Sequence, residues 1–522
     1  MRTPSLLSCL LLAVASPAWA WPMPAAAPKT QPVAAPPAGE APPADATPPA
    51  DATPPADATP PADASPPADA DEPGLPAGLD AGDPSDAGDP SDAGSDEPGL
   101  PAGLGEDEPA SSAAKGSSSL PLEWRAIVDL RAGSRLLDDP LERRMSLGEA
   151  RVQLDLSKAW RPWSAIAQLT VDAVGDGLMD GLEPKLESGA GVVDLRTAAL
   201  TVSPTSWLDV RAGRQTLTWG TGDLVFLNDL FPKDWTAFLI GRHDEYLKAP
   251  SDAIKLAAYT DAAGLDLVIT PRFDADRLPL RDRLSSWDPM QARLAGQDDP
   301  MNLAAPDRWV EDGELAARLF RNVGSWELAG YAYRGFWKSP GGADPTSGAA
   351  LFPELSVYGA SVRGPALGGL VQVETAFYDS SEDRRGKDPL TRNSELRGLL
   401  GHERQLTQKL SMSAQYYVEA MLHHGSYLGS LPPGMPAADR VRHVLTTRLT
   451  YLALRQRLML SAFVFVSPSD GDAFARAGLT YTVDDHWTLL AGANLLAGRD
   501  QHTMFGQFER NSNAYLGLRY AY

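Results

Sequence analysis

Charged side chains of both signs recur at every second position in several segments of the chain, which places them on one face of an extended strand. Between residues 124 and 132, Arg125, Asp129 and Arg131 share one face and apolar residues share the other, with Ile127 as the exception. Opposite charges across a hydrated space create a transverse field that favours polar solutes; alternatively, they only neutralise one another. The residues that we expect on this polar inner face are Arg125, Asp129, Arg131, Glu149, Arg151, Asp155, Asp194, Arg196, Asp209 and Arg211.

Two long segments, 218–250 and 273–312, combine charged and aromatic residues. Segments of this length inside a compact fold are usually functional or disordered, and their aromatic content argues against disorder. Folded inward, either one would narrow a passage. The candidates for such a constriction are Asp229, Asp234, Arg242, Arg277 and Arg281, although mixed clusters of this kind also form salt bridges that only hold a loop in place.

Bond-making chemistry is not indicated. The sequence contains no G-x-S-x-G, Walker, H-E-x-x-H or G-x-G-x-x-G motif, so we predict neither an enzyme nor a cofactor. The adjacent His423 and His424 would point to opposite sides of a strand, which does not favour a metal site there. Cys9 is the single cysteine, so cysteine-ligated metals and disulfides are not expected. We also do not expect the protein to bind nucleic acid.

The N-terminal fifth of the chain differs in composition from the rest. Residues 1–20 read as a signal peptide, with Arg2, an apolar run and an Ala18-Trp19-Ala20 cleavage site. Residues 21–119 form an acidic, Pro/Ala/Asp-rich tract that we predict to be a disordered, extended linker. From residue 22 to 119 there are 18 acidic and 2 basic residues, so this tract carries 16 of the 22 net negative charges. The acidity of the chain therefore says little about what residues 120–522 bind.

Residues 120–522 consist of segments of about 10 residues with alternating apolar and polar side chains, as in strands with one apolar face. The same alternation places Asp194 and Arg196 opposite Leu195 and Thr197. Short connections, near 158–162, 203–206, 261–264, 322–324, 364–366, 406–409, 454–456 and 484–485, alternate with long ones, and only 467–472 is a short member of the long set. This asymmetry is typical of transmembrane barrels. The sequence therefore predicts an all-β, antiparallel transmembrane β-barrel of about eighteen strands, with sixteen as the alternative.

Aromatic residues support this topology independently. Trp124, Trp163, Trp207, Trp326 and Trp487 each begin a strand that leaves the same end of the predicted barrel, where indole rings form an interfacial girdle. The chain ends in alternating apolar residues and an aromatic, Leu516, Leu518, Tyr520 and Tyr522. This ending resembles the C-terminal signal that outer-membrane barrels present to their assembly machinery.

Short motifs also carry a family resemblance. Gly213-Arg214-Gln215 with Trp219-Gly220, the pair Asn228-Asp229, and the ending Phe505-Gly506-Gln507-Phe508 with Arg519 to Tyr522 look like segments of porin-like and alginate-export-like outer-membrane barrels. The resemblance supports the barrel superfamily without naming a solute.

These patterns predict a Gram-negative outer-membrane pore for small hydrophilic solutes, reached by signal-peptide-dependent export. Two alternatives stay open: the barrel of an export system for polysaccharide or other polar cargo with the acidic tract as its periplasmic handle, and a structural or adhesive surface barrel. The expected partners are outer-membrane lipid, the barrel-assembly machinery through the strand ending in Tyr522, and a periplasmic partner or the cell wall for the acidic tract.

Overall fold

The computed structural model describes residues 122–161, 164–178, 183–186, 189, 191–279 and 281–522. The chain divides into two units, Met1–Gly94 and Ser95–Tyr522, and every described residue belongs to the second. The predicted signal peptide, the acidic tract and Trp163 therefore lie outside the described residues. Within the described ranges, no helix is long and apolar enough to cross a membrane.

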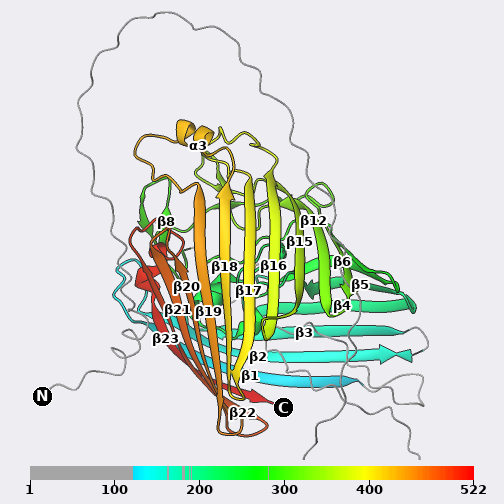
Figure 1. Ribbon diagram of the computed structural model, residues 1–522. Helices are drawn as coiled ribbons and strands as arrows, with labels where there is room; N and C mark the ends of the chain where they lie inside the picture. Colours follow the sequence, from blue (N-terminus) through cyan, green and yellow to red (C-terminus); the bar gives the residue numbers. More distant parts are fainter. Residues whose placement is uncertain (1–121, 162–163, 179–182, 187–188, 190, 280) are drawn as a thin grey trace, which may run out of the picture. The chain divides into compact units, whose positions relative to one another are not determined.

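Eighteen strands form one closed antiparallel sheet (Figure 1). Each strand pairs with the neighbours before and after it, and the last strand returns to pair with the first, with Ile127 opposite Ala521 and Arg135 opposite Asn513. The strands are β1 (Glu123–Arg135), β2 (Met145–Trp160), β3 (Ala165–Asp176), β4 (Val193–Thr205), β5 (Leu208–Thr216), β6 (Pro250–Tyr259), β7 (Gly264–Thr270), β11 (Glu314–Val323), β12 (Trp326–Phe336), β15 (Glu354–Ala366), β16 (Gly369–Ser380), β17 (Glu395–Thr407), β18 (Leu410–Met421), β19 (Val441–Ala453), β20 (Leu458–Ser467), β21 (Asp472–Thr482), β22 (Trp487–Gly498) and β23 (Asn513–Ala521). The prediction of an antiparallel barrel of eighteen strands, rather than sixteen, is confirmed.

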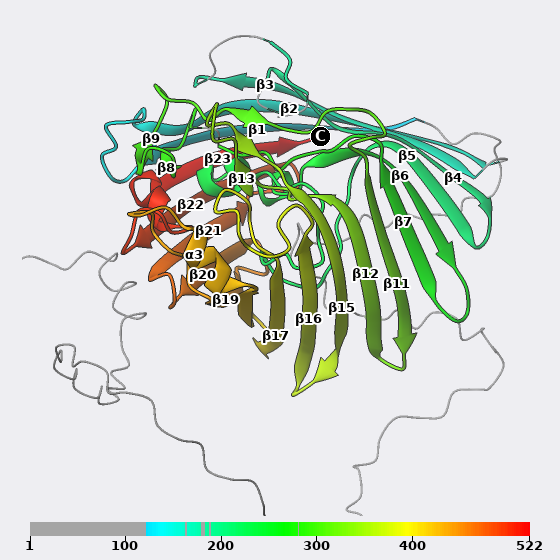
Figure 2. The same cartoon turned by 90° about the horizontal axis from the view of Figure 1, so that it is seen from above.

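The connections alternate in length as predicted. Tight turns join β2–β3, β4–β5, β6–β7, β11–β12, β15–β16, β17–β18, β19–β20 and β21–β22. The other ends carry long loops, except for the four residues 468–471 between β20 and β21. These loops hold the short elements α2 (Trp235–Ile240), η2 (Asp244–Tyr246), β8 (Ser286–Asp288), β9 (Arg293–Ala295), β10 (Leu303–Ala304), β13 (Gly342–Ala343), β14 (Ala350–Leu351), α3 (His424–Ser430) and η3 (Gly506–Asn511). Seen from above, loop segments lie inside the ring of strands (Figure 2).

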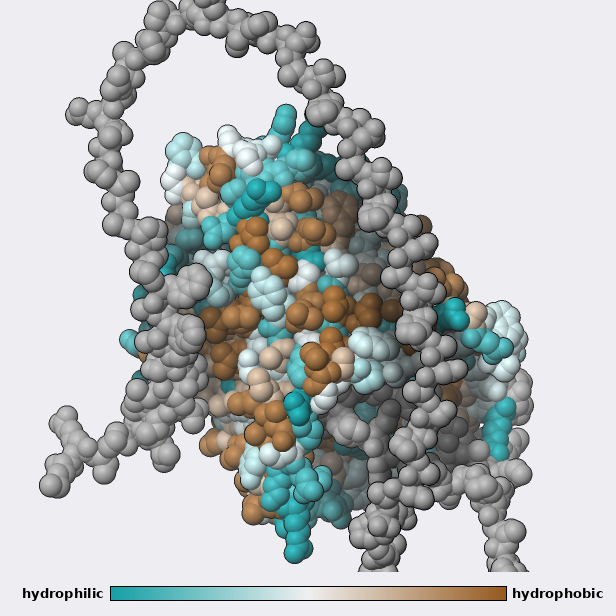
Figure 3. Space-filling view, in the orientation of Figure 1, coloured by the Kyte–Doolittle hydropathy of each residue, from teal (hydrophilic) through white to brown (hydrophobic). Residues whose placement is uncertain are grey.

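The two faces of the wall differ in polarity, and the predicted alternation explains why. In β1 the charged residues Asp129 and Arg131 are buried inside the barrel, whereas Leu130 on the outer face is 44% exposed. In β17 the same holds for Glu395 and Leu396. In Figure 3 apolar residues gather across the middle of the visible wall, with hydrophilic residues above and below. Such an apolar exterior suits contact with lipid. Closure of the barrel also leaves no strand edge with unpaired backbone groups inside a bilayer.

The alternation predicted for residues 194–197 is wrong at one position. The β3–β4 register shifts there, so that Leu195 pairs with Val171 but Thr197 pairs with Thr170, and Arg196 is the extra residue of a β-bulge. Thr197 therefore does not continue the face of Leu195. Arg196 keeps the predicted inward position that it shares with Asp194; it is 6% exposed and donates to the carbonyl of Glu245 at 2.7 Å.

Aromatic residues occupy the turn end of the wall. Trp124 and Trp207 are 54% and 52% exposed at the starts of β1 and β5, and Trp487 is exposed at the start of β22. Trp124 stacks on Tyr522 with ring centroids 5.0 Å apart, which joins the first and last strands at this end. Trp326, at the start of β12, is half-buried.

Candidate functional site

The loop between β5 and β6, residues 217–249, folds into the barrel and contacts strands on most sides of the wall. We divide it into a first lobe, residues 217–232, and a second lobe, residues 233–249. The first lobe contacts the part of the wall that runs from β11 to β19. The second lobe contacts the rest of the ring from β20 through β23 and β1 to β4. A segment held on opposite walls in this way narrows the interior.

Glu374 of β16 holds the tip of the first lobe. Its carboxylate accepts hydrogen bonds from the backbone N–H of Thr221, from the Thr221 hydroxyl at 2.7 Å, from the Gly222 N–H at 3.0 Å and from Asn228 Nδ2 at 2.9 Å. The side chain is 1% exposed, and its hydrogen-bond donors are neutral groups. Backbone donors of this kind satisfy a buried carboxylate only if the loop keeps its conformation.

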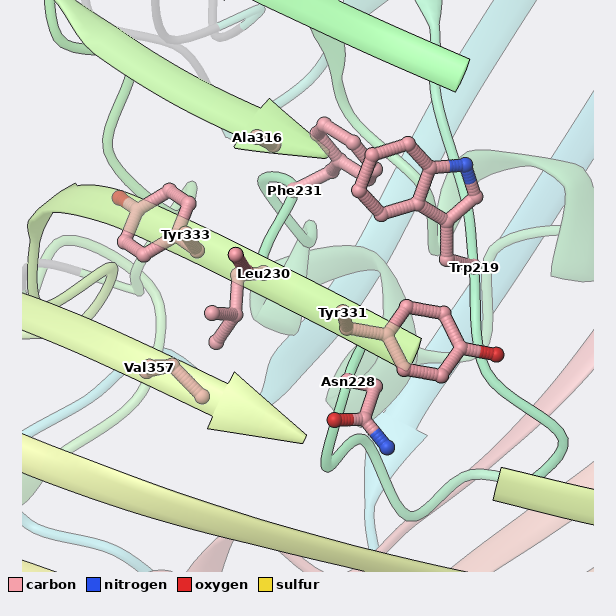
Figure 4. A pocket seen from close by; sticks show the side chains of 9 residues that line it. Trp219, Asn228, Leu230, Phe231, Ala316, Tyr331, Tyr333 and Val357 are labelled. Atoms are coloured by element: carbon pink, nitrogen blue, oxygen red, sulfur yellow. The ribbon is translucent and has the colours of Figure 1, made fainter. Parts of the chain in front are cut away.

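Aromatic packing fixes the rest of the first lobe. Trp219 and Phe231 meet edge to face with ring centroids 4.9 Å apart, and Trp219 also contacts Tyr331 of β12. Figure 4 shows these rings around a small, mostly apolar cavity between the lobe and the strands β11, β12 and β15. Tyr378 of β16 donates to the carbonyl of Leu227 at 2.5 Å. The lobe is therefore attached to this wall by both apolar and polar contacts.

The second lobe lies against β20 to β2. Asp234 caps α2 by accepting a hydrogen bond from the N–H of Ala237. Phe238 in the helix packs on Phe474 of β21, with ring centroids 4.9 Å apart. The helix ends at Gly241, whose positive φ of 89° and close approach to the Tyr515 ring require a residue without Cβ. Its carbonyl accepts a hydrogen bond from Arg131 of β1 at 2.8 Å.

A buried ionic network then ties the second lobe to β2 and β4. Glu149 accepts from Arg242 of the loop at 2.5 Å and from Arg151 of its own strand at 3.0 Å. Arg277, from the loop between β7 and β11, pairs with Asp194 of β4 at 2.9 Å and lies 3.8 Å from Asp234. All of these side chains are less than a tenth exposed. Burial works to lower the pKa of Arg242, but the carboxylates of Glu149 and Asp234 together outweigh it and the pKa is raised, so the pair stays charged.

Three further ion pairs between the loop and the wall are partly open to solvent. Asp223 of the first lobe pairs with Arg448 of β19 at 2.6 Å, and their side chains are 15% and 19% exposed. Asp244 of the second lobe pairs with Arg476 of β21 at 2.7 Å, and the Asp244 side chain is 49% exposed.

The third pair joins Glu245 to Arg519 of β23 at 2.9 Å, with the Glu245 side chain 31% exposed. Arg448 and Arg476 lie near the middle of their strands, so the open space beside them is at mid-height inside the barrel. Burial works to raise the pKa of Asp244, but Arg476, His243 and Arg448 together outweigh it and the pKa is lowered, which keeps this carboxylate ionised.

The structure distributes the predicted interior residues among three environments. Asp129, Arg131, Glu149, Arg151, Asp194, Arg196, Asp229, Asp234, Arg242, Arg277 and Arg281 are buried; Asp155, Asp209 and Arg211 are half-buried; Arg125 is exposed at the turn end. Within the constriction candidates, Asp229 pairs with Lys233 and Arg281 pairs with Asp288. These candidates therefore make contacts that hold loops in position.

The solvent-accessible pairs involve residues that the sequence candidates did not include. Arg448, Arg476 and Arg519 lie on strands near the C-terminus, more than 190 residues beyond the end of the loop. The signal for them was present, because each occupies the inward position of an alternating segment. Extending the face assignment made for β1 and β2 to these strands would have identified them.

Metal binding has no structural support in the described ranges, where no group of three or more His, Cys, Asp or Glu side chains is arranged to hold an ion. His423 directly precedes the short helix α3, and His424 is its first residue. The predicted strand geometry at this pair is therefore wrong. The Nε2–H of His424 donates a hydrogen bond to the Ala438 carbonyl at 2.9 Å.

Comparison with known proteins gives similarity of fold only. No protein-family model matches the chain, and no curated protein sequence matches it. Among solved structures, the chain is similar to Acinetobacter baumannii OccAB1, with 11% identity and a TM-score of 0.48 over 80% of this chain and 99% of that one. Pseudomonas aeruginosa OccK11 (OpdR) gives 11% identity and a TM-score of 0.44 over 77% and 95%. Salmonella typhi OmpF, in a complex with daunomycin, gives 8% identity and 0.39 over 77% and 97%.

Proposed function

We propose that the chain forms an outer-membrane channel for small hydrophilic solutes. The observation that carries the proposal is the set of solvent-accessible ion pairs at mid-height inside a closed barrel, where Asp223 and Asp244 of the loop face Arg448 and Arg476 of the wall. A charged side chain that is half exposed in that position borders water. A passage bordered by both signs of charge attracts polar solutes and disfavours apolar ones.

The wall supports a membrane location for this passage. Its outer face carries exposed aliphatic and aromatic side chains, and its backbone hydrogen bonds close on themselves through the β1–β23 pair. Both properties are what a bilayer demands of a β-structure. An eighteen-stranded barrel is also too wide for wall side chains alone to fill, so the loop decides how much of the interior stays open.

Single-channel recording from the purified full chain in planar bilayers tests the proposal. We expect discrete conductance steps. The reversal potential measured in a salt gradient reports ion selectivity, and changing both Asp223 and Asp244 to Asn should shift it in the direction of higher anion selectivity. The Arg448→Gln and Arg476→Gln double variant should move it the opposite way. An electrically silent barrel in sealed membranes, with correct folding verified by circular dichroism, would contradict a channel.

A further inference from the structure

Four basic side chains lie exposed on one sector of the turn end of the barrel, from β11 to β20. They are Arg321, Arg404, Lys409 and Arg455, and we call this set the basic rim. Arg321 shares the outer face of β11 with Leu319, which is 58% exposed, and Arg404 shares the outer face of β17 with Leu400, which is 54% exposed. Arg321 and Arg404 therefore lie about two and four residues nearer to the turns than these exposed leucines of the outer face.

None of the four cations has an ion pair or hydrogen bond among the described residues of the barrel. This contrasts with the interior, where arginines such as Arg242 and Arg476 are matched by carboxylates. The other sector of the same end differs in charge, because its one exposed arginine, Arg125, is accompanied by the exposed carboxylates Glu123, Asp261, Asp484 and Asp485. The exposed charge of this end is therefore mainly positive in the sector of the basic rim, where it can attract an anionic partner from outside the chain.

Exposed aliphatic side chains accompany the basic rim. Leu367 and Leu454, at the tips of two turns, are 80% and 61% exposed, and Val323 and Leu406 are 52% and 47% exposed. On the opposite side, away from the turns, Arg321 and Arg404 adjoin the exposed Leu319 and Leu400 of the outer face. Cations bordered by this apolar wall match a molecule with an anionic head and an apolar tail. A small soluble anion would use the cations alone and leave Leu319 and Leu400 without a partner.

We propose that the basic rim binds anionic phospholipids of the leaflet on the turn side of the barrel, with phosphate groups on the four cations. The inference rests on the proposed membrane location of the barrel. A strand residue advances by about 3.3 Å, so Arg321 lies about 7 Å beyond Leu319, at the depth where acyl chains give way to headgroups. Cations near an anionic membrane surface each strengthen association about fivefold.

Native mass spectrometry of the full chain tests this binding. The protein is reconstituted in bilayers of phosphatidylcholine containing one-tenth phosphatidylglycerol, released in mild detergent, and scored for the number of phosphatidylglycerol molecules retained. A variant with Arg321, Arg404, Lys409 and Arg455 changed to Gln should lose about fivefold in retention for each charge removed, toward the level of non-specific carry-over. A charge-matched control changes four exposed basic residues at the loop end to Gln, namely Arg385, Lys387, Arg440 and Arg499, and should retain the lipid.

Equal retention by the basic-rim variant and the wild type would overturn the inference. So would complete displacement of the lipid by millimolar inorganic phosphate, which would indicate a site for the free anion, or by a synthetic peptide of residues 95–109, which would indicate an acidic polypeptide as the occupant. Conductance is recorded from the same preparations. Loss of lipid specificity in a conducting barrel would refute only the lipid site, and a silent barrel that retains the lipid would refute only the channel.

Discussion

Two sets of ion pairs join the inward loops to different parts of the wall, and they differ in access to water. The pairs of Arg242 with Glu149 and of Arg277 with Asp194 are sealed, with each side chain less than a tenth exposed. The pairs of Asp223 with Arg448 and of Asp244 with Arg476 border open space. Buried charges are strongly destabilising when one partner is lost, whereas hydrated pairs contribute little to stability. The sealed set therefore holds the loop, and the hydrated set is free to act on a passing solute.

The largest effect should come from breaking the sealed set. Glu149→Ala leaves Arg151, Arg242 and Arg283 without their shared carboxylate. We expect a loss of about 3–5 kcal/mol in the free energy of unfolding, measured by urea titration in detergent or lipid. The matched change in the hydrated set, Asp244→Asn, should cost less than about 1 kcal/mol. Similar losses for the two variants would contradict the division into sealed and hydrated pairs.

The next effect concerns the tip of the first lobe. Glu374→Gln replaces a carboxylate that accepts from Thr221, Gly222 and Asn228 with an amide whose NH2 group faces the donors of Asn228. We expect the tip to detach at a cost of about 1–3 kcal/mol, visible as frequent closures and raised current noise in single-channel records. Glu327→Gln, on a half-buried carboxylate paired with Arg318 lower in the barrel, is the control and should leave the noise unchanged.

Ion selectivity sharpens the comparison from the hydrated side. Removing the two carboxylates Asp223 and Asp244 leaves two arginines beside the passage, which should shift the permeability ratio of chloride to potassium upward by about three- to tenfold at 0.1 M salt. The shift should shrink at 1 M salt, because screening shortens the reach of each charge. The sealed-set variant Asp194→Asn, if it folds, should change selectivity less than this double variant.

The smallest effect depends on pH. Burial raises the pKa of Glu142, in the loop between β1 and β2, to about 7, and Arg135 offsets this only in part. The folded-state pKa lies above the unfolded value, so the folded protein binds this proton more tightly. The resulting stabilisation is complete below about pH 4 and is lost as the pH rises toward 7.

Glu142→Gln should abolish this dependence. The full shift corresponds to about 2.5 kcal/mol between pH 5 and pH 8, and because solvent screens this half-buried group we expect the variant to gain about 1 kcal/mol relative to the wild type. Urea midpoints at the two pH values measure the difference. Parallel curves for wild type and variant would show that Glu142 does not titrate in this range.

The fold could be predicted because its signals are local. Alternation within each strand assigns the two faces, and the length of each connection assigns it to one end. The bulge at Arg196 could not be predicted, since a bulge depends on how two strands align rather than on either strand alone. The loop 218–250 was correctly selected as an inward segment. Whether one of its charges ends in a sealed or a hydrated pair depends on strands distant in sequence, so Asp234 and Asp244 looked equivalent before the structure placed them.

Closure of the sheet has a consequence for biogenesis. The first strand obtains its second neighbour only from residues 513–521, so the ring cannot be completed until the whole polypeptide has been synthesised and delivered. Pairing of such distant partners is slow, and until it occurs both terminal strands expose free edges that invite aggregation. A product shortened by its final strand would keep such an edge indefinitely and should stay prone to edge-to-edge association.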